Sequence, residues 1–169
     1  MADIISKSSK YGIQSVLYLA NKAKSGAATQ LRVISNDLGI PHHFLGKILQ
    51  ILVKDEIIRS QKGSKGGFTL GRPASRITLM EIVEAIDGTS FLDHCVLGFS
   101  KCDELQPCPA HADWKRPKSL ILDGLLKKTI DDLGDDFSRK LQSMGDNNDW
   151  TVSRTQADRR GSALSSPNN

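Results

Sequence analysis

All three cysteines of this chain lie in one short stretch, close to a histidine. They are Cys95, Cys102 and Cys108, and His111 follows to give the spacing Cys-x6-Cys-x5-Cys-x2-His in a chain of 169 residues. Thiolate sulfur is a soft ligand that suits zinc, copper(I) and iron–sulfur clusters, and imidazole is a common ligand beside it. The stretch from His94 to His111 therefore predicts a metal centre.

The width of the cysteine spacing favours a centre that is larger than one ion. A structural zinc site usually includes two cysteines separated by only two to four residues, whereas the intervals here are six and five residues. An open loop of this kind fits a cluster of several irons better. A zinc site, or three reduced thiols that bind nothing, are the alternatives, and His94 is a spare candidate ligand.

The charge of the chain is divided unevenly between its two parts. The net charge is +4, but residues 1–76 carry 12 Lys and Arg against 4 Asp and Glu, while residues 77–169 carry 11 against 15. A basic front part beside a slightly acidic back part predicts a polyanion-binding end. An unevenly charged, solvated surface is the alternative interpretation.

The composition also indicates a compartment. An odd number of cysteines argues against a disulfide framework, and the first residues lack the layout of a secretion signal. No apolar run approaches the roughly 18–20 residues that span a bilayer. We therefore expect a cytoplasmic protein without a membrane partner, in which clustered cysteines bind metal or sense redox state.

The residues before the cysteines show the pattern of a winged helix-turn-helix. Apolar residues at helical spacing predict three helices, and the turn Gly39-Ile40-Pro41 joins the second to the third. Two strand-like runs around a glycine-rich tip predict a β-wing; no helix opens at these glycines, so they do not form a phosphate-binding loop. The helices are expected over about 6–24, 29–38 and 42–54, and the strands over 57–62 and 68–70.

Further helices are predicted on both sides of the cysteines. Thr78 can cap a helix over about 79–86, with Glu81 at its third position. A long helix is expected from Ala112 to about Phe137, and its apolar stripe needs another surface to bury it. That surface is the chain's own first helix or, as we expect, the same helix of a second copy in a homodimer. The stripe consists of Leu122, Leu125, Leu126, Ile130 and Leu133.

The expected fold class is mainly α with a small β-wing, that is, a winged helix-turn-helix followed by a long dimerisation helix. The DNA-binding domain covers 1–88, and the cysteine loop that binds the cluster covers 89–111. The dimerisation helix covers 112–144. Residues 145–169 are polar and poor in aliphatic residues, and are expected to be disordered.

The third helix and the wing carry the candidate DNA-binding residues. In a helix-turn-helix the second helix of the motif enters the major groove, where lysine can meet guanine or phosphate and glutamine can pair with adenine. Basic residues on a wing fit the DNA backbone or the minor groove. Because only 5% of the residues are aromatic, double-stranded DNA is a better expectation than stacking on single-stranded RNA. The candidates are His42, His43, Lys47, Gln50, Arg59, Lys62 and Lys65, and a solvated surface residue is the alternative for each.

Three runs of this sequence resemble the Rrf family of winged-helix transcription regulators. They are residues 40–54, which begin Ile-Pro-His-His-Phe-Leu-Gly-Lys, residues 62–70 and residues 77–88, and the resemblance covers about 5–133. It implies a DNA-binding transcriptional regulator, most simply a repressor, that senses redox state, nitric oxide or iron–sulfur status. The sequence shows no acid–base pair or nucleophile constellation, so no enzymatic activity is expected.

The resemblance also implies a set of cluster ligands. IscR-like members hold a 2Fe–2S cluster with three loop cysteines and a histidine just after the third, and Cys95, Cys102, Cys108 and His111 match these places. NsrR-like members hold a 4Fe–4S cluster, whose fourth ligand can be an acidic residue where this chain has Lys10. A 2Fe–2S cluster is therefore favoured and a 4Fe–4S cluster stays possible. The first interval, of six residues, departs from the five common in the family. A cluster-free thiol-based regulator and a winged-helix protein-interaction module are the alternative functions.

Overall fold

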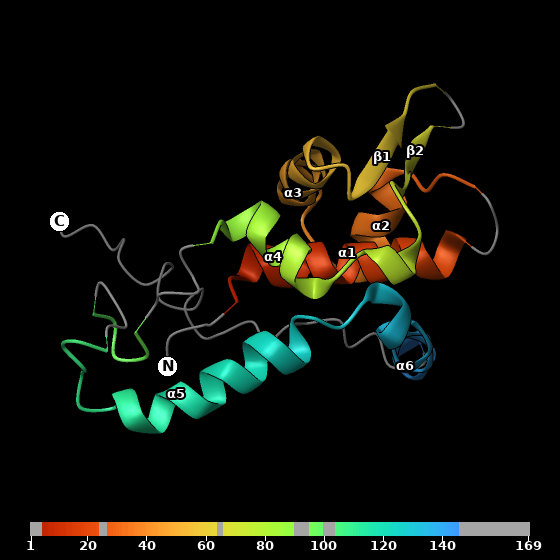
Figure 1. The fold of residues 1–169 in the computed structure, drawn as a ribbon. Helices are drawn as coiled ribbons and strands as arrows, with labels where there is room; N and C mark the ends of the chain where they lie inside the picture. Colours follow the sequence, from red (N-terminus) through yellow and green to blue (C-terminus); the bar gives the residue numbers. More distant parts are fainter. Residues whose placement is uncertain (1–4, 24–26, 64–65, 90–94, 100–103, 146–169) are drawn as a thin grey trace, which may run out of the picture.

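The computed structural model describes residues 5–23, 27–63, 66–89, 95–99 and 104–145, with side chains up to residue 140. The predictions made for Lys65, His94, Cys102 and the tail beyond residue 145 lie outside these residues. Figure 1 shows a body of helices with a two-stranded wing at its top and a helical arm below it. The elements in chain order are α1 (Lys7–Ala23), α2 (Leu31–Leu38), α3 (His42–Lys54), β1 (Ile58–Gln61), β2 (Gly67–Leu70), the 3-10 turn η1 (Ala74–Arg76), α4 (Leu79–Asp87), α5 (His111–Ser119), the π-helix η3 (Leu120–Leu125) and α6 (Ile130–Gly145).

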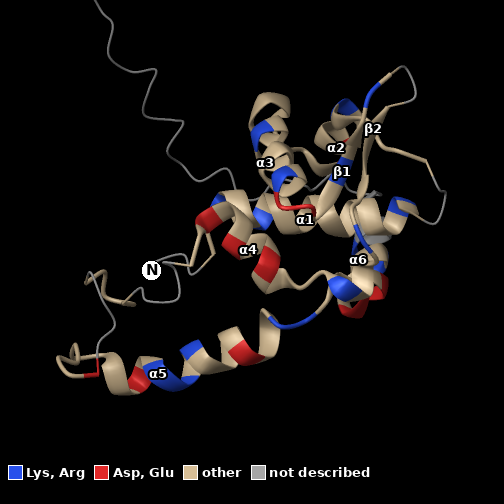
Figure 2. Ribbon diagram, turned by 45° about the horizontal axis from the view of Figure 1, so that its top comes forward, with Lys and Arg blue, Asp and Glu red and all other residues tan. Residues whose placement is uncertain are grey.

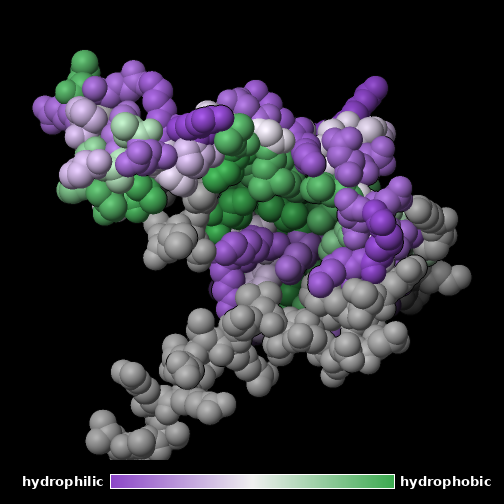
Figure 3. All heavy atoms as spheres, turned by 90° about the horizontal axis from the view of Figure 1, so that it is seen from below, coloured by the Kyte–Doolittle hydropathy of each residue, from purple (hydrophilic) through white to green (hydrophobic). Residues whose placement is uncertain are grey.

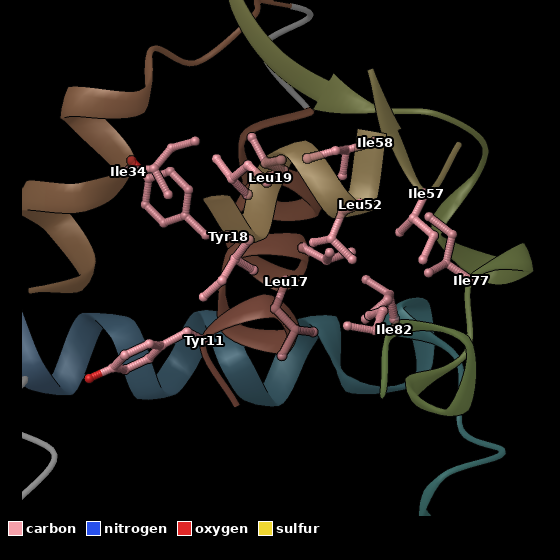
Figure 4. Packing of buried hydrophobic residues seen from close by; sticks show 14 of the residues in the cluster. Tyr11, Leu17, Tyr18, Leu19, Ile34, Leu52, Ile57, Ile58, Ile77 and Ile82 are labelled. Carbon is pink, nitrogen blue, oxygen red and sulfur yellow. The ribbon is translucent and has the colours of Figure 1, made fainter. Parts of the chain in front are cut away.

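Helix α1 forms the centre of the body, because it packs against α2, α3, α4, α6 and β2. Most of the apolar residues predicted from helical spacing are buried, among them Ile34 of α2 and Leu52 of α3, and Figure 4 shows both in one cluster with Leu19 of α1. Burying a large aliphatic side chain contributes about 1.5–3 kcal/mol. The core therefore holds α3 firmly against α1 and α2, and the predicted helix-turn-helix is confirmed.

The close approach of α1 to α4 depends on Gly12. A Cβ atom at this position would lie 2.3 Å from Cδ1 of Ile86 and 3.3 Å from Cγ2 of Ile82. We expect Gly12→Val to lower the free energy of unfolding by about 1–3 kcal/mol, as overpacking of a core does. Urea denaturation followed by circular dichroism measures this change.

Gly134 of α6 offers a matched control, because a Cβ atom there would meet nothing within 4 Å. Valine is a better helix former than glycine, so Gly134→Val should leave the free energy of unfolding unchanged or raise it slightly. Equal losses of stability in the two variants would contradict the packing of α1 on α4 described here.

The turn between α2 and α3 is held by local geometry. Gly39 ends α2 in the left-handed conformation, with φ of 61°, which glycine adopts without steric penalty. The buried Ser35 hydroxyl donates a hydrogen bond of 2.7 Å to the carbonyl of Ile40. Helix α3 then begins directly after Pro41. The direction of α3 is therefore set by the turn as well as by the core.

The wing is an antiparallel pair, with Ile58 opposite Leu70 and Gln61 opposite Gly67. The segment before α2 pairs with the free edge of β2, since Thr29 exchanges backbone hydrogen bonds of 2.8 and 2.9 Å with Phe68. A Cβ atom on Gly67 would lie 2.5 Å from the Thr29 backbone, so only glycine allows this approach. The base of the wing is thereby tied to the segment that leads into α2.

Helix α4 begins with the predicted capping box. The Thr78 hydroxyl accepts the backbone N–H of Glu81, and the Glu81 carboxylate accepts the backbone N–H of Thr78. The next two N–H groups of the helix have no partner within it. They are satisfied from a distant segment: Leu79 donates to the carbonyl of Lys128 at 3.0 Å and Met80 to that of Leu126 at 2.7 Å.

The single long helix expected over 112–137 is wrong, because the chain leaves the helical path at Leu126–Thr129. The carbonyls of this segment cap α4, and Ile130 donates its N–H to Ile77 at 2.8 Å. A new helix, α6, then begins with its own cap: Thr129 and Asp132 exchange hydrogen bonds. Hydrogen bonds from the Thr129 N–H and hydroxyl hold the pKa of Asp132 below its ordinary value. We call residues 126–130 the junction.

The break at the junction divides the apolar stripe between two surfaces. Leu133 and Phe137 of α6 pack on the core beside α1, and Asn21 of α1 donates a hydrogen bond to Ser138. On the other side of the junction, Leu120 and Leu125 of the arm (α5 with η3) are 64% and 44% exposed. The chain's own core therefore covers most of the stripe, including Leu122 and Leu126 before α6, and leaves Leu125 exposed. Within the described residues, no helix has the length and apolar character needed to cross a bilayer.

Candidate DNA-reading surface and cysteine site

The outer side of α3 presents the predicted reading residues together. Leu45, Ile48, Leu49 and Leu52 are buried, which turns the opposite side of the helix to solvent. His42, His43, Lys47 and Gln50 are all exposed there. A helix presented in this way has the form that enters a major groove.

The wing adds basic residues to the same surface. Arg59 of β1 is exposed, as is Lys62 just beyond that strand, while Ile58 of β1 is buried in the core. Figure 2 shows blue segments on α2, α3 and the wing, whereas α4 carries only acidic charges. Part of the basic charge recognised from composition therefore lies on α2, α3 and the wing.

Two further exposed basic residues near α3 were missed from the sequence. Arg32 is exposed on α2, the helix that crosses the DNA backbone in such motifs. Lys7 of α1 lies with its Nζ 5.7 Å from the ring centroid of Tyr11, and that ring meets Phe44 of α3 edge-on at 5.8 Å. Arg32 could have been found from its place in the first turn of α2. The position of Lys7 depends on the tertiary contact.

The structure describes two of the three cysteines of the predicted site, Cys95 and Cys108. Cys95 is 2% exposed and Cys108 is half-buried, and their sulfur atoms lie 3.4 Å apart. A disulfide bond is about 2.05 Å long, so this pair is in contact without being bonded. The structure thus brings together two thiols that are separated by 13 positions in the sequence.

The surroundings of Cys95 favour its thiolate form. Burial alone raises the pKa of this thiol, but hydrogen bonds from the Leu97 backbone N–H, the Cys108 thiol and the backbone N–H groups of Phe99 and Gly98 lower it, and the net pKa is below the ordinary value. The thiolate is the form that binds metals. The turn from Cys95 to Phe99 therefore favours loss of the proton from this thiol.

His111 stands at the start of the arm, next to the cysteine pair. Its backbone N–H donates to the Cys108 carbonyl at 2.9 Å, so the first residue of α5 is hydrogen-bonded to the residue that carries the third thiol. Among the described residues no three metal-ligating side chains converge. Cys102 is outside those residues, and its part in a ligand set stays a prediction, as does that of His111.

Comparison with known proteins identifies the family. Residues 5–136, most of the chain, match Rrf2, which is described as an iron-dependent transcriptional regulator. The chain belongs to the Rrf2 family. The resemblance seen in three runs of the sequence is thereby confirmed.

Individual Rrf2-like relatives agree with this placement. An HTH-type transcriptional regulator of Aquifex aeolicus (strain VF5) is 32% identical over 132 residues, which cover 77% of this chain and 90% of the relative. IscR of Pectobacterium carotovorum subsp. carotovorum (strain PC1) is 26% identical over 146 residues, 86% of this chain and 87% of IscR. The structure of CymR, the global cysteine regulator of B. subtilis, matches with a TM-score of 0.67 at 23% identity, covering 80% of this chain and 98% of CymR, which supports the fold.

Membership of the Rrf2 family makes this chain a DNA-binding transcriptional regulator and not an enzyme. The expected fold class, mainly α with a small wing, is also confirmed. The choice of individual DNA-contacting residues, the metal ligands and the dimer stay predictions.

Proposed function

We propose that this Rrf2 regulator senses through an iron–sulfur cluster held by Cys95, Cys102, Cys108 and His111, and reads duplex DNA with α3 and the wing. The observation that carries the sensing part is the Cys95–Cys108 sulfur pair, 3.4 Å apart. Two thiolates bound at about 2.3 Å to one tetrahedral metal are separated by roughly 3.8 Å. The pair therefore needs only a few tenths of an ångström of adjustment to share a metal atom.

The donor set fits an iron–sulfur cluster better than a single hard cation. Thiolate sulfur is soft, and the described part of the site supplies sulfur rather than carboxylate oxygen. When bound, such a cluster would join the cysteine loop to the start of α5, and oxygen, nitric oxide, peroxide or iron scarcity could remove it. We favour a 2Fe–2S cluster with His111 as the fourth ligand, since Lys10 stands where an acidic ligand would be needed; a 4Fe–4S cluster is the alternative.

The chain's own contacts provide a route from the cysteine site to the wing. The Cys108 carbonyl accepts the first N–H of α5, and the other end of the arm is bonded through the junction to the start of α4. From there the Glu81 carboxylate reaches Arg72, just beyond β2, at 2.6 Å. A change in the direction of the arm is thus communicated to the base of the wing.

We further propose that two copies pair through their arms. Leu120 and Leu125 are exposed on the arm, and Figure 3 shows an apolar area on the underside of the body next to it. Exposed apolar surface on both elements fits a self-complementary interface between two identical chains. Pairing would set the distance between two copies of α3, and DNA half-sites about one helical turn apart are sensitive to that distance.

Changing both exposed leucines of the arm should separate the dimer. We expect Leu120→Glu with Leu125→Glu to shift the sedimentation mass from twice 18.5 kDa to 18.5 kDa, because two charges per chain would have to be buried. Ser119→Glu is the control, since Ser119 is exposed beside them and should leave the dimer intact. A monomeric wild type, or an unchanged mass in the double variant, would argue against pairing by the arm.

The proposed function is tested on protein purified without oxygen. Iron, acid-labile sulfide and visible absorption report the cluster, and gel shift of a duplex from the regulator's own promoter region reports DNA binding. We expect iron and sulfide in the purified protein and different DNA affinities before and after iron is removed. Colourless protein that takes up no iron on reconstitution would leave the cluster-free thiol-based regulator, which the 3.4 Å thiol pair also permits.

A further inference from the structure

Cys95 and Cys108 form a close pair of thiols within the cysteine site. Their sulfur atoms are 3.4 Å apart, so closing a bond of about 2.05 Å requires a movement of about 1.4 Å. Rotation of two side chains can supply a movement of that size. Each backbone is anchored beside the pair: the Cys95 carbonyl accepts the N–H of Gly98, and the Cys108 carbonyl accepts that of His111.

The two thiols differ in their access to solvent. Cys108 is half-buried, while Cys95 is 2% exposed beneath it. A small oxidant therefore meets Cys108 first, and Cys95 is the neighbouring thiol that can resolve the product. This arrangement of an accessible thiol beside a second one is typical of redox-sensing cysteines.

We propose that Cys95 and Cys108 close into a disulfide when the site holds no iron and a peroxide is present. The Cys108 thiolate attacks one oxygen of hydrogen peroxide, the O–O bond breaks, and a sulfenic acid and hydroxide result. This hydroxide takes up the proton that the Cys108 thiol released and becomes water. The Cys95 thiolate then attacks that sulfur, the S–O bond breaks, and hydroxide leaves and takes up a proton. In sum, two thiols lose two electrons and two protons, and one peroxide becomes two waters.

The disulfide would change what the site can do. It would remove two of the thiolates proposed to hold iron, so the oxidised chain could not be reloaded until a thiol reductant opened the bond. It would also tie Cys95 covalently to Cys108, whose carbonyl accepts the N–H of His111, the first residue of α5. This second effect deepens the proposed sensing function and rests on it, whereas formation of the bond needs only the two thiols.

The pairing is tested on the full chain stripped of metal and treated anaerobically with one equivalent of hydrogen peroxide. Remaining thiols are alkylated, and digestion with trypsin and a glutamate-specific protease cuts after Lys101 and Glu104. Each cysteine then lies on a separate peptide. We expect peptides 85–101 and 105–115 to be joined and lighter by two hydrogens. The Cys102→Ser variant should give the same product, and Cys95→Ser and Cys108→Ser should not.

Two results would overturn the pairing. One is a main product in which Cys102 is linked to either of the other cysteines. The other is Cys108 oxidised to sulfinic acid while Cys95 is recovered alkylated. Because Cys102→Ser removes a proposed iron ligand, a disulfide formed in that variant stands independently of the cluster. A wild type that takes up iron but forms no such disulfide would refute only this inference.

Discussion

Serine in place of Cys108 should remove iron from the protein. The Cys108 sulfur lies 3.4 Å from that of Cys95, and a hydroxyl oxygen is a poor replacement for a soft thiolate. We expect the iron and sulfide bound per chain to fall at least about tenfold, since even groups that only support a ligand change metal affinity 10–100-fold. Cys95→Ser and Cys102→Ser should have the same effect.

The two histidines that border the cysteine stretch provide the matched comparison. His111→Ala should weaken iron binding or change the visible spectrum, and His94→Ala should do neither. Far-ultraviolet circular dichroism should show unchanged helix content in all variants, because the hydrophobic cluster of the described residues does not include Cys95, Cys108 or His111. Loss of iron in His94→Ala with iron retained in His111→Ala would reverse the assignment of the fourth ligand. Full iron in all three serine variants would contradict the site.

Alanine in place of Lys47 should weaken binding to the duplex that the wild type shifts. Lys47 is exposed in the middle of α3, where a lysine can reach a guanine edge or a phosphate. A base contact is worth about 1–3 kcal/mol, or roughly 5- to 150-fold in affinity. Lys62→Ala on the wing should act differently, by weakening all sequences alike.

The salt dependence of binding separates these two kinds of contact. Each phosphate contact contributes about 0.9 to the slope of log affinity against log salt, so losing one from each copy of a dimer should lower the slope by about 2. Arg139→Ala is the control: Arg139 pairs with Asp136 on α6, and the variant has the same charge change away from the reading surface. Unchanged affinity in both lysine variants would exclude the docking proposed here.

Local sequence signals were sufficient to predict α3 and the start of α4. In α3 the spacing of Leu45, Ile48, Leu49 and Leu52 marked the buried side, and all four are buried. The Thr78–Glu81 capping box was equally legible, because both partners lie within one helical turn. These elements could be predicted since each is determined by residues three or four apart.

The junction shows where the same reasoning failed. Apolar spacing continues from Leu122 to Leu133 across residues 126–129, so periodicity alone indicates one helix. A local signal was present in Thr129 and Asp132, which cap α6, but it competed with the longer pattern. What decides the break is the bonding of two carbonyls to the unsatisfied N–H groups at the start of α4, nearly fifty residues earlier.

The sequence by itself determined the winged helix, the family and the concentration of three cysteines beside a histidine, because each is expressed in residue type and short-range spacing. Only the tertiary structure decided that Cys95 and Cys108 touch, and that α6 packs on α1 while Leu120 and Leu125 of the arm stay exposed. Such contacts join segments that share no periodic pattern. They depend on packing and on satisfying backbone groups across the whole chain.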